Sequence, residues 1–362
     1  MTTPPDPPIV APSAGRWYQV WRVARYLLGL AAVGFAAWIV SGKTDELSGA
    51  TTYLRHLRWW WVAVAVGAEA VSYLALASLQ RRLLRSGGVR VPMAPMTGIA
   101  LAGNAIANSL PGGLVFYSAY NYRQYRRFGA DEVLAGWTLV AFNAVTFVSL
   151  SVISLVGLTM ALTAGNAYDL VEAILGIAIF AGLIVILWAE RVWLLSHITR
   201  VVALSQRVLR HPSPSRSAGD VVHGWVDRMS AITPSRRNWA RAMVMGFGNW
   251  IADCACLVLA FMAVGAGVPW RGLLLAYGAG QLAAILPITP GGLGVVEGSI
   301  TVALVTFGGG QASTVAAVLL YRLISFWLLL PVGWASWLAL LIAGRNHDRS
   351  TVVPEPERLA AT

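Results

Sequence analysis

The chain has few of the residues that soluble enzymes and metal proteins use for chemistry. Only 12% of its 362 residues are charged, and Lys43 is its single lysine. The two cysteines, Cys254 and Cys256, are two residues apart in one apolar segment, so on a helix their side chains point in different directions. That spacing argues against a disulfide or a metal site, and the sequence has no Gly-rich phosphate loop or nucleophile elbow. We therefore expect no cofactor and no metal.

Histidine is also scarce, and it is poorly placed for chemistry within a membrane. Intramembrane proteolysis and phosphatase chemistry usually need a buried histidine or a close pair of acids, and the sequence arranges neither convincingly. This favours a protein that is not an enzyme. All five histidines fall outside the predicted membrane segments: His56, His197, His211, His223 and His347.

Apolar residues make up 57% of the chain, and its mean hydropathy is +0.63. That composition predicts an all-α polytopic membrane protein. The net charge of +11 comes almost wholly from arginine. In a membrane protein such an excess marks cytoplasmic loops and contact with anionic lipid head groups, not nucleic acid. The arginine bias is typical of a GC-rich genome, so we expect a multi-pass protein of a bacterial inner membrane.

The hydropathy pattern predicts about six full spans, with two broken apolar segments between them. The broken segments are 97–121 and 272–307. The full spans are 24–41, 59–79, 133–162, 170–189, 242–264 and 312–343.

Each broken segment has proline and glycine at its centre, in Leu110-Pro111-Gly112-Gly113 and in Leu286-Pro287-Ile288-Thr289-Pro290-Gly291-Gly292-Leu293-Gly294. Proline and glycine break a helix and leave backbone N–H and C=O groups without partners. Lipid cannot satisfy those groups, so such a break must be buried in protein or line a watery cavity. A pair of breaks in corresponding halves of one chain indicates a transporter-type binding site.

Loop charge predicts how these segments are oriented. Loops 80–90 and 190–241 and the N-terminal flank are rich in arginine and are expected in the cytoplasm, with the tail at 344–362. Segment 97–121 must then be a re-entrant hairpin that opens to the cytoplasm, and segment 272–307 one that opens to the outside. The halves 24–189 and 242–343 would be inverted repeats, with Gly103-Asn104 echoed by Gly280-Gln281. The competing interpretation is that each broken segment is two short helices or one kinked helix.

The segments outside the two halves are predicted from composition. Residues 1–23 are expected to form a disordered cytoplasmic tail, and a first helix that is retained is favoured over a signal peptide. Loop 190–241 is partly amphipathic, which suits helices lying in the membrane interface, although a solvated linker explains it equally well.

Four ionisable residues fall within the predicted membrane segments: Glu69, Asp253, Glu297 and Arg322. Charges in a membrane are costly and are functional candidates by default. We expect Glu297 to pair with Arg322, either as a salt bridge that fixes the second hairpin or as part of a substrate site. In the second case the guanidinium of Arg322 would donate two parallel hydrogen bonds to a lipid phosphate. The acids would balance charge, bind an amine head group or carry a coupling proton.

Neutral groups complete the predicted substrate site. Backbone N–H groups at the glycines of the two tips would attract anions, and three amide side chains add hydrogen-bonding capacity. The set is Asn104, Asn108, Gln281, Gly112, Gly113, Gly291 and Gly292, with Pro111, Pro287 and Pro290 shaping the hairpin tips.

The run Leu286–Glu297 followed by Leu320-Tyr321-Arg322-Leu323 resembles the lysylphosphatidylglycerol synthase transmembrane family, also called UPF0104. That family includes the flippase domain of the multiple peptide resistance factor. The first half agrees more loosely, through Tyr120-Asn121-Tyr122-Arg123-Gln124-Tyr125 before Gly129 and through Ala141–Phe147. The similarity runs from about residue 20 to 343.

The resemblance implies a lipid flippase fold with re-entrant helices. It also implies movement of aminoacylated phospholipids or polyprenyl-phosphate-linked sugars, with Glu297 and Arg322 matching the family's Glu and Arg. There are two departures. A soluble aminoacyl-transferase domain is not expected after residue 343, so the chain would be a stand-alone member. Some members carry a Glu-Arg pair after the first hairpin, where this chain reads Val140-Ala141, so a two-fold symmetric charge site is not expected.

These observations predict a lipid translocase whose partners are membrane lipids, either phospholipid or polyprenyl phosphate. The alternatives are a secondary transporter of a small anion and a non-transporting partner of a lipid-modifying enzyme. Glycines such as Gly246 and Gly248 could support close helix contacts in a homo-oligomer.

Overall fold

The computed structural model describes residues 53–110, 113–162, 234–285 and 289–351, with side chains as far as Ala343. Within these ranges the chain is helical and has no strand. Predicted spans 24–41 and 170–189, the N-terminal tail and most of loop 190–241 lie outside them, as do Pro111, Gly112 and Pro287. The helices are α3 (Trp59–Ser86), α4 (Met93–Ser109), α5 (Gly113–Arg127), α6 (Glu132–Leu162), α9 (Arg236–Val264), α10 (Trp270–Ile285), η1 (Pro290–Gly292), α11 (Val295–Thr306), α12 (Gln311–Arg322), η2 (Leu323–Leu328) and α13 (Leu329–Thr351).

Four described helical segments are long and apolar enough to cross a membrane: α3, α6, α9 and Gln311–Ala343, which runs from α12 into α13. They coincide with predicted spans 59–79, 133–162, 242–264 and 312–343. Three of them extend further than predicted, since α3 continues through Arg81, Arg82 and Arg85, α9 begins at Arg236 and α13 continues past residue 343 to Thr351. Arginine forms helices readily, and its long stem covers apolar surface while its head stays in water.

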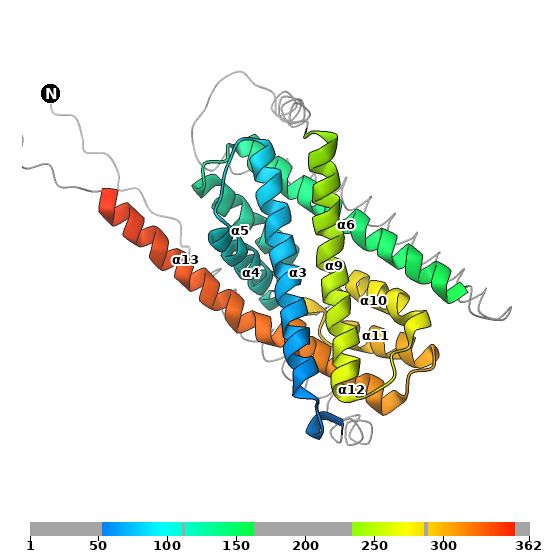
Figure 1. The fold of residues 1–362 in the computed structure, drawn as a ribbon. Helices are drawn as coiled ribbons and strands as arrows, with labels where there is room; N and C mark the ends of the chain where they lie inside the picture. The colour runs from blue at the N-terminus through cyan, green and yellow to red at the C-terminus, as the bar shows by residue number, and fades with distance from the viewer. Residues whose placement is uncertain (1–52, 111–112, 163–233, 286–288, 352–362) are drawn as a thin grey trace, which may run out of the picture. The chain divides into compact units, whose positions relative to one another are not determined.

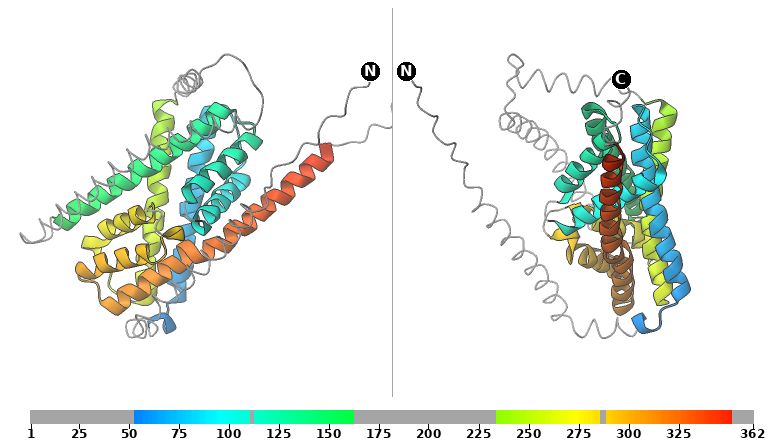
Figure 2. Two further views of the ribbon diagram at one scale, coloured as in Figure 1. Left: turned by 180° about the vertical axis from the view of Figure 1, so that it is seen from behind. Right: turned by 90° about the vertical axis from the view of Figure 1, so that its left-hand side faces the viewer.

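Helices α3 and α9 pack side by side along most of their length (Figure 1). The other long helices contact the opposite half of the chain. Helix α6 packs along α10, and α13 packs along α4 (Figures 1 and 2). The last described helix of each half therefore covers the first short helix of the other half.

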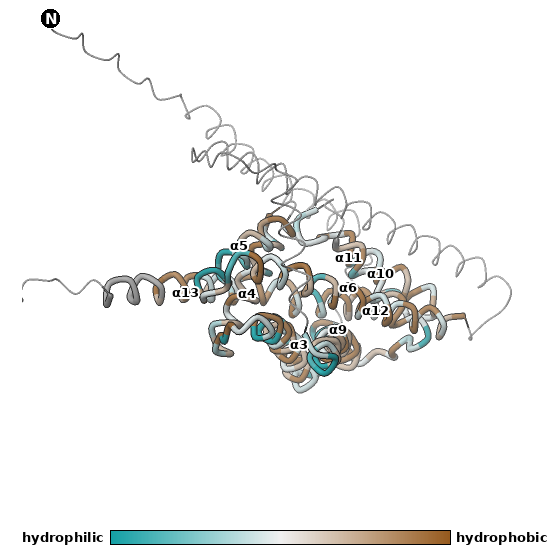
Figure 3. The backbone as a smooth tube through the Cα atoms, turned by 90° about the horizontal axis from the view of Figure 1, so that it is seen from above, coloured by the Kyte–Doolittle hydropathy of each residue, from teal (hydrophilic) through white to brown (hydrophobic). Residues whose placement is uncertain are grey.

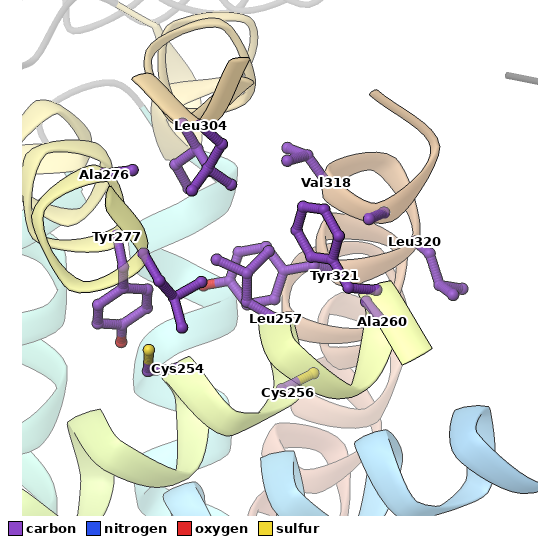
Figure 4. Close-up of a cluster of buried hydrophobic side chains, with 14 of the residues drawn as sticks. Cys254, Cys256, Leu257, Ala260, Ala276, Tyr277, Leu304, Val318, Leu320 and Tyr321 are labelled. Carbon is purple, nitrogen blue, oxygen red and sulfur yellow. The ribbon is translucent and has the colours of Figure 1, made fainter. Parts of the chain in front are cut away.

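Each half also has its own apolar core. One core lies among α3, α4, α5 and α6 and includes Leu79, Met96 and Trp137. The other lies among α9, α10, α11 and α12 and includes Leu257 and Leu304 (Figure 4). Both cores are filled from helices on either side of a break, so packing fixes the breaks in place.

Both predicted broken segments are interrupted in the structure. Helix α4 ends at Ser109, Leu110 is extended, and α5 begins at Gly113. Helix α10 ends at Ile285, the single turn η1 follows, and α11 begins at Val295. The two helices flanking each break pack against each other.

Small residues allow that close packing in both halves. A Cβ atom on Gly103 of α4 would stand 2.6 Å from Nδ2 of Asn121 in α5. A Cβ atom on Gly280 of α10 would stand 2.4 Å from Cγ1 of Ile300 in α11. Glycine therefore occupies matching places in the two helix pairs, which is where membrane helices use small residues to approach closely.

Basic residues gather at one end of the bundle. Arg126 and Arg127 end α5, Arg85 lies in the last turn of α3, and Arg82 of α3 interacts electrostatically with Arg241 near the start of α9. Hydrophilic positions mark α5 and the near ends of α3 and α9 in the view from above (Figure 3). These three helix ends therefore belong to one face, and we call it the basic end.

Candidate functional site

The second break forms a tight turn between two other elements. A Cβ atom on Gly291 would stand 2.2 Å from Cε2 of Phe326 in η2 and 3.2 Å from the carbonyl oxygen of Asn108 at the end of α4. Gly291 also has a φ of 61°, in the left-handed region that favours glycine. Pro290–Gly292, hereafter the Pro-Gly-Gly turn, therefore lies between the end of α4 and the segment that follows Arg322.

Arg322 holds this turn. Its Nε donates a hydrogen bond to Oε1 of Glu297 over 2.7 Å, and its Nη2 donates to the carbonyl oxygen of Gly291 over 2.9 Å. Its guanidinium carbon lies 4.5 Å from the centre of the Phe326 ring. The arginine is thus in contact with a carboxylate, a backbone carbonyl and an aromatic face, and the predicted Glu297–Arg322 pair is present.

Glu297 has a second bond that explains its position. It is in the first turn of α11, and its Oε2 accepts a hydrogen bond from the backbone N–H of Gly294 over 2.7 Å. A carboxylate at a helix N-terminus satisfies a free N–H and is favoured by the helix dipole. One side chain therefore caps α11 and pairs with Arg322.

A second cluster of polar side chains surrounds Asp253 of α9. Oδ2 of this carboxyl accepts hydrogen bonds from the Tyr277 hydroxyl over 2.6 Å and from Nε2 of Gln281 over 3.1 Å, and the Tyr321 hydroxyl lies 3.1 Å from both oxygens. Gln281 also donates to the Tyr321 hydroxyl over 2.8 Å. Tyr277 and Tyr321 enter this region from α10 and α12, on either side of Leu257 (Figure 4).

Glu69 of α3 completes the set of charges. It is 4% exposed, and its carboxyl lies within hydrogen-bonding reach of Asp253. Its Oε2 is buried and has no hydrogen-bond partner among the residues that the structure describes. Arg322 interacts electrostatically with Asp253. The structure therefore brings together all four ionisable residues that the sequence placed in the membrane.

The remaining predicted site residues are placed differently. Asn104 donates to the carbonyl oxygen of Ala100 in its own helix, and Asn108 presents its backbone carbonyl to the Pro-Gly-Gly turn. Gly113 begins α5, where a Cβ atom would overlap the carbonyl of Ala107. Gly292 approaches Ala284 of α10. These residues shape the two breaks, while Gln281 alone among the predicted neutral side chains bonds to the charged group.

A family model described as the lysylphosphatidylglycerol synthase TM region matches residues 25–333. The chain belongs to this family. The resemblance predicted from the motifs around Glu297 and Arg322 is thereby confirmed. Together with the four apolar helical segments, it makes the chain a multi-pass membrane protein.

Relatives of the lysylphosphatidylglycerol synthase transmembrane family match this chain at modest identity. A UPF0104 membrane protein of Methanothermobacter thermautotrophicus is 25% identical over 328 residues, which are 86% of this chain and 93% of that protein. Another match to a UPF0104 membrane protein of that organism is 32% identical over 100 residues, 28% of each chain. A UPF0104 membrane protein of Pyrococcus horikoshii is 28% identical over 97 residues, 27% of this chain and 29% of that protein.

Two polar residues of this family member were not predicted as part of the site from the sequence. Tyr277 and Tyr321 were not assigned to the site, although they donate to Asp253. The close pair of acids formed by Glu69 and Asp253 was not recognised either. One signal was available for Tyr277, because it lies four residues before Gln281 and therefore shares its helix face.

Proposed function

We propose that the protein moves a lipid between the two leaflets of the bacterial inner membrane, and that the lipid is an anionic or aminoacylated phospholipid or a polyprenyl-phosphate-linked glycolipid. The observation that carries this proposal is the convergence of four ionisable residues within apolar helices, one of which, Arg322, bonds to the Pro-Gly-Gly turn. Charged residues in a membrane are expensive and usually mark a substrate or ion pathway. Family membership supports the same class of function.

The helix arrangement supports an alternating route through the membrane. We interpret α4–α5 and α10–α11 as re-entrant hairpins of two inverted repeats. Their breaks approach each other, since the Pro-Gly-Gly turn lies against the end of α4. Helices α6 and α13 cover the opposite hairpins, a reciprocal arrangement that inverted repeats would produce. The positive-inside rule assigns the basic end to the cytoplasm, together with both termini.

Arg322 is the group that we propose to recognise the lipid phosphate. In this structure its Nη2 bonds to a neutral carbonyl, that of Gly291. A phosphate oxygen is a stronger acceptor for a guanidinium than a backbone carbonyl. A bound phosphate could therefore take this bond and release the Pro-Gly-Gly turn, while the acyl or prenyl chains stay in lipid. Glu297 and Asp253 supply negative charge for an aminoacyl head group, and Glu69 lies beside Asp253.

Lipid movement in proteoliposomes tests this function. Fluorescent phosphatidylglycerol placed in one leaflet would be followed by quenching of the outer leaflet, with wild type, Arg322→Ala and Arg322→Lys. We expect wild type to move lipid and Arg322→Ala to lose at least about tenfold of that rate. We expect the rate of Arg322→Lys to be intermediate, because lysine keeps the positive charge but cannot donate two parallel hydrogen bonds to a phosphate.

The matched control is Arg126→Ala, which removes an exposed arginine at the end of α5 and should leave the rate unchanged. Wild-type rates equal to those of empty liposomes, for phosphatidylglycerol and for a polyprenyl phosphate alike, would overturn the proposal. Counterflow of a small radiolabelled anion without lipid movement would favour a secondary transporter instead.

A further inference from the structure

Two acids face each other where α3 and α9 pack together. Glu69 of α3 is 4% exposed and Asp253 of α9 is 8% exposed, and their carboxyl groups lie within hydrogen-bonding reach. Nearby, Ser72 of α3 donates to Asn249 of α9 over 3.1 Å, so polar contacts continue along the same interface. The acids are therefore held together by the two most extensively packed helices of the described chain.

No cation pairs with these acids among the described residues. Among the described residues, Arg322 interacts electrostatically with Asp253, but its hydrogen bonds go to Glu297 and to Gly291. Helix α4 and η2 carry no titratable side chain, and α6 carries only Glu132, at its exposed start. The titratable and charged groups that surround the pair are Tyr73 of α3, Cys254 and Cys256 of α9, Tyr277 of α10, Tyr321 and Arg322 of α12, and Glu297 beyond Arg322.

The two carboxyl groups have unequal surroundings. Asp253 accepts hydrogen bonds from Tyr277, Gln281 and Tyr321, which suits a carboxylate. Glu69 receives no such donor at Oε2. Two ionised carboxylates at this separation in an apolar interior would repel each other strongly, whereas a protonated one can donate to its neighbour. A proton on Glu69 therefore satisfies both groups at once.

We propose that Glu69 and Asp253 form a proton-binding site, in which Glu69 carries the proton and donates it in a hydrogen bond to Asp253. Calcium and magnesium need six or more oxygen ligands, but Asp253 already accepts from three donors. The described residues also contain no group of three or more acids, cysteines or histidines arranged to hold a metal. The site therefore suits a proton better than a sodium or calcium ion.

A line of buried polar groups leads from this pair toward the basic end. Tyr73 lies one helical turn beyond Glu69 and interacts electrostatically with Glu69 and with Tyr117 of α5. Nε2 of Gln80 donates to the Tyr117 hydroxyl over 2.8 Å. Further along are fully buried atoms without hydrogen-bond partners in the described residues: Gln80 Oε1, Asn121 Oδ1 and the Tyr125 hydroxyl.

Buried polar atoms without a protein partner usually bind ordered water. With water at these atoms, the polar line would connect Glu69 to the basic end and let a proton from bulk water reach the carboxylate. Because Arg322 interacts electrostatically with Asp253, gain or loss of this proton changes the charge beside the residue that is proposed to bind lipid phosphate. Coupling to lipid movement rests on the proposed function, whereas proton binding by the pair does not.

Infrared difference spectroscopy tests proton binding without any transport. The purified full chain in lipid would be titrated with acid and base, and the C=O stretch of a buried carboxylic acid would be followed. We expect this band in wild type, its loss in Glu69→Gln, and no change in Glu132→Gln, an exposed control with the same chemical replacement. Transfer to D2O should shift the band if the polar line carries water. A band that persists in Glu69→Gln would overturn the assignment, and one that fails to shift would exclude the route.

A second variant guards against a folding defect in Glu69→Gln. Asp253→Asn keeps the shape of the side chain but replaces the charged carboxylate acceptor with a weaker, neutral amide oxygen, so the Glu69 band should move in frequency while remaining present. An unmoved band would show that the two carboxyls do not share the proton.

Proteoliposomes with a pH gradient test the coupling. We expect the rate of lipid movement by wild type to change by about fivefold or more when the pH gradient is imposed. We expect the rate for Glu69→Gln to be the same with and without the gradient. Dependence on a sodium gradient alone would overturn the choice of ion. Lipid movement without pH dependence would refute coupling and leave the translocase proposal intact. The infrared band without any lipid movement would support the proton site and refute the translocase.

Discussion

Arg322 and Glu297 share a bond of 2.7 Å, and the same Glu297 carboxylate accepts the backbone N–H of Gly294 over 2.7 Å. The arginine therefore does not sit beside the second break as a free cation. It is attached to the start of α11 through Glu297 and to the Pro-Gly-Gly turn through the carbonyl of Gly291. Any ligand that attracts Arg322 must compete with these contacts, so ligand binding and the position of the turn are linked.

The pair should contribute measurably to stability. Arg322→Met and Glu297→Gln should each lower the thermal unfolding temperature in detergent, because each leaves a partly buried charge without its partner. The double variant should be less destabilised than the sum of the two, with a coupling energy of about 1–3 kcal/mol. A coupling energy near zero would mean that the two side chains do not stabilise each other in the membrane protein.

The Pro-Gly-Gly turn should not tolerate a side chain at Gly291. Gly291→Ala places a methyl group 2.2 Å from Phe326 in a left-handed conformation that costs about 1–2 kcal/mol for other residues. We expect a lower unfolding temperature and slower lipid movement. Adding Phe326→Ala removes the overlap but not the backbone cost, so it should recover stability only in part.

Gly298→Ala is the matched control for Gly291. Gly298 lies within α11, and nothing stands within 4 Å of the position that its Cβ would take. Alanine is a better helix former than glycine, so this variant should be neutral or stabilised by up to about 1 kcal/mol. Equal damage from both substitutions would contradict the specific geometry assigned to the Pro-Gly-Gly turn.

Local chemistry allowed part of this arrangement to be predicted from the sequence. Proline followed by paired glycines breaks an apolar helix, which located both breaks, and the cost of charge in lipid singled out Glu69, Asp253, Glu297 and Arg322. Periodicity could not show which side chains meet across helices. In a membrane protein the surface that faces lipid is as apolar as the core, so the pattern of α6 or α11 does not reveal how the helix is rotated.

The tyrosines show this limit most clearly. Tyr277 and Tyr321 lie in apolar helices. From sequence alone, a tyrosine in such a helix is interpreted as a core residue, because the partner of its hydroxyl is not known. The partner is Asp253, which is 24 residues from Tyr277 and 68 from Tyr321 along the chain. The predicted role of the four charged residues in binding cargo stays a prediction.

The hydroxyls on Asp253 should matter for stability as well as for position. Tyr277→Phe and Tyr321→Phe keep the ring and its packing but each removes one donor from a buried carboxyl, at a cost of about 1–3 kcal/mol. We expect both variants to unfold at lower temperature in detergent, and the control Tyr53→Phe, at an exposed tyrosine, to unfold as wild type. If Tyr277→Phe were as stable as wild type, the 2.6 Å bond to Asp253 would not be an important contact.

Glycine at position 280 should be required for α10 and α11 to pack as they do. Gly280→Ala would place a methyl group 2.4 Å from Cγ1 of Ile300, whose side chain is fully buried and cannot easily move aside. Overpacking of this kind typically costs about 1–3 kcal/mol, so the unfolding temperature should fall. Ile300→Ala in the same chain removes the obstructing atom. The pair Gly280→Ala/Ile300→Ala should therefore be more stable than the sum of the single effects predicts. Simple additivity would mean that α11 does not pack against Gly280, and the interpretation of α10–α11 as a closely packed hairpin would fail with it.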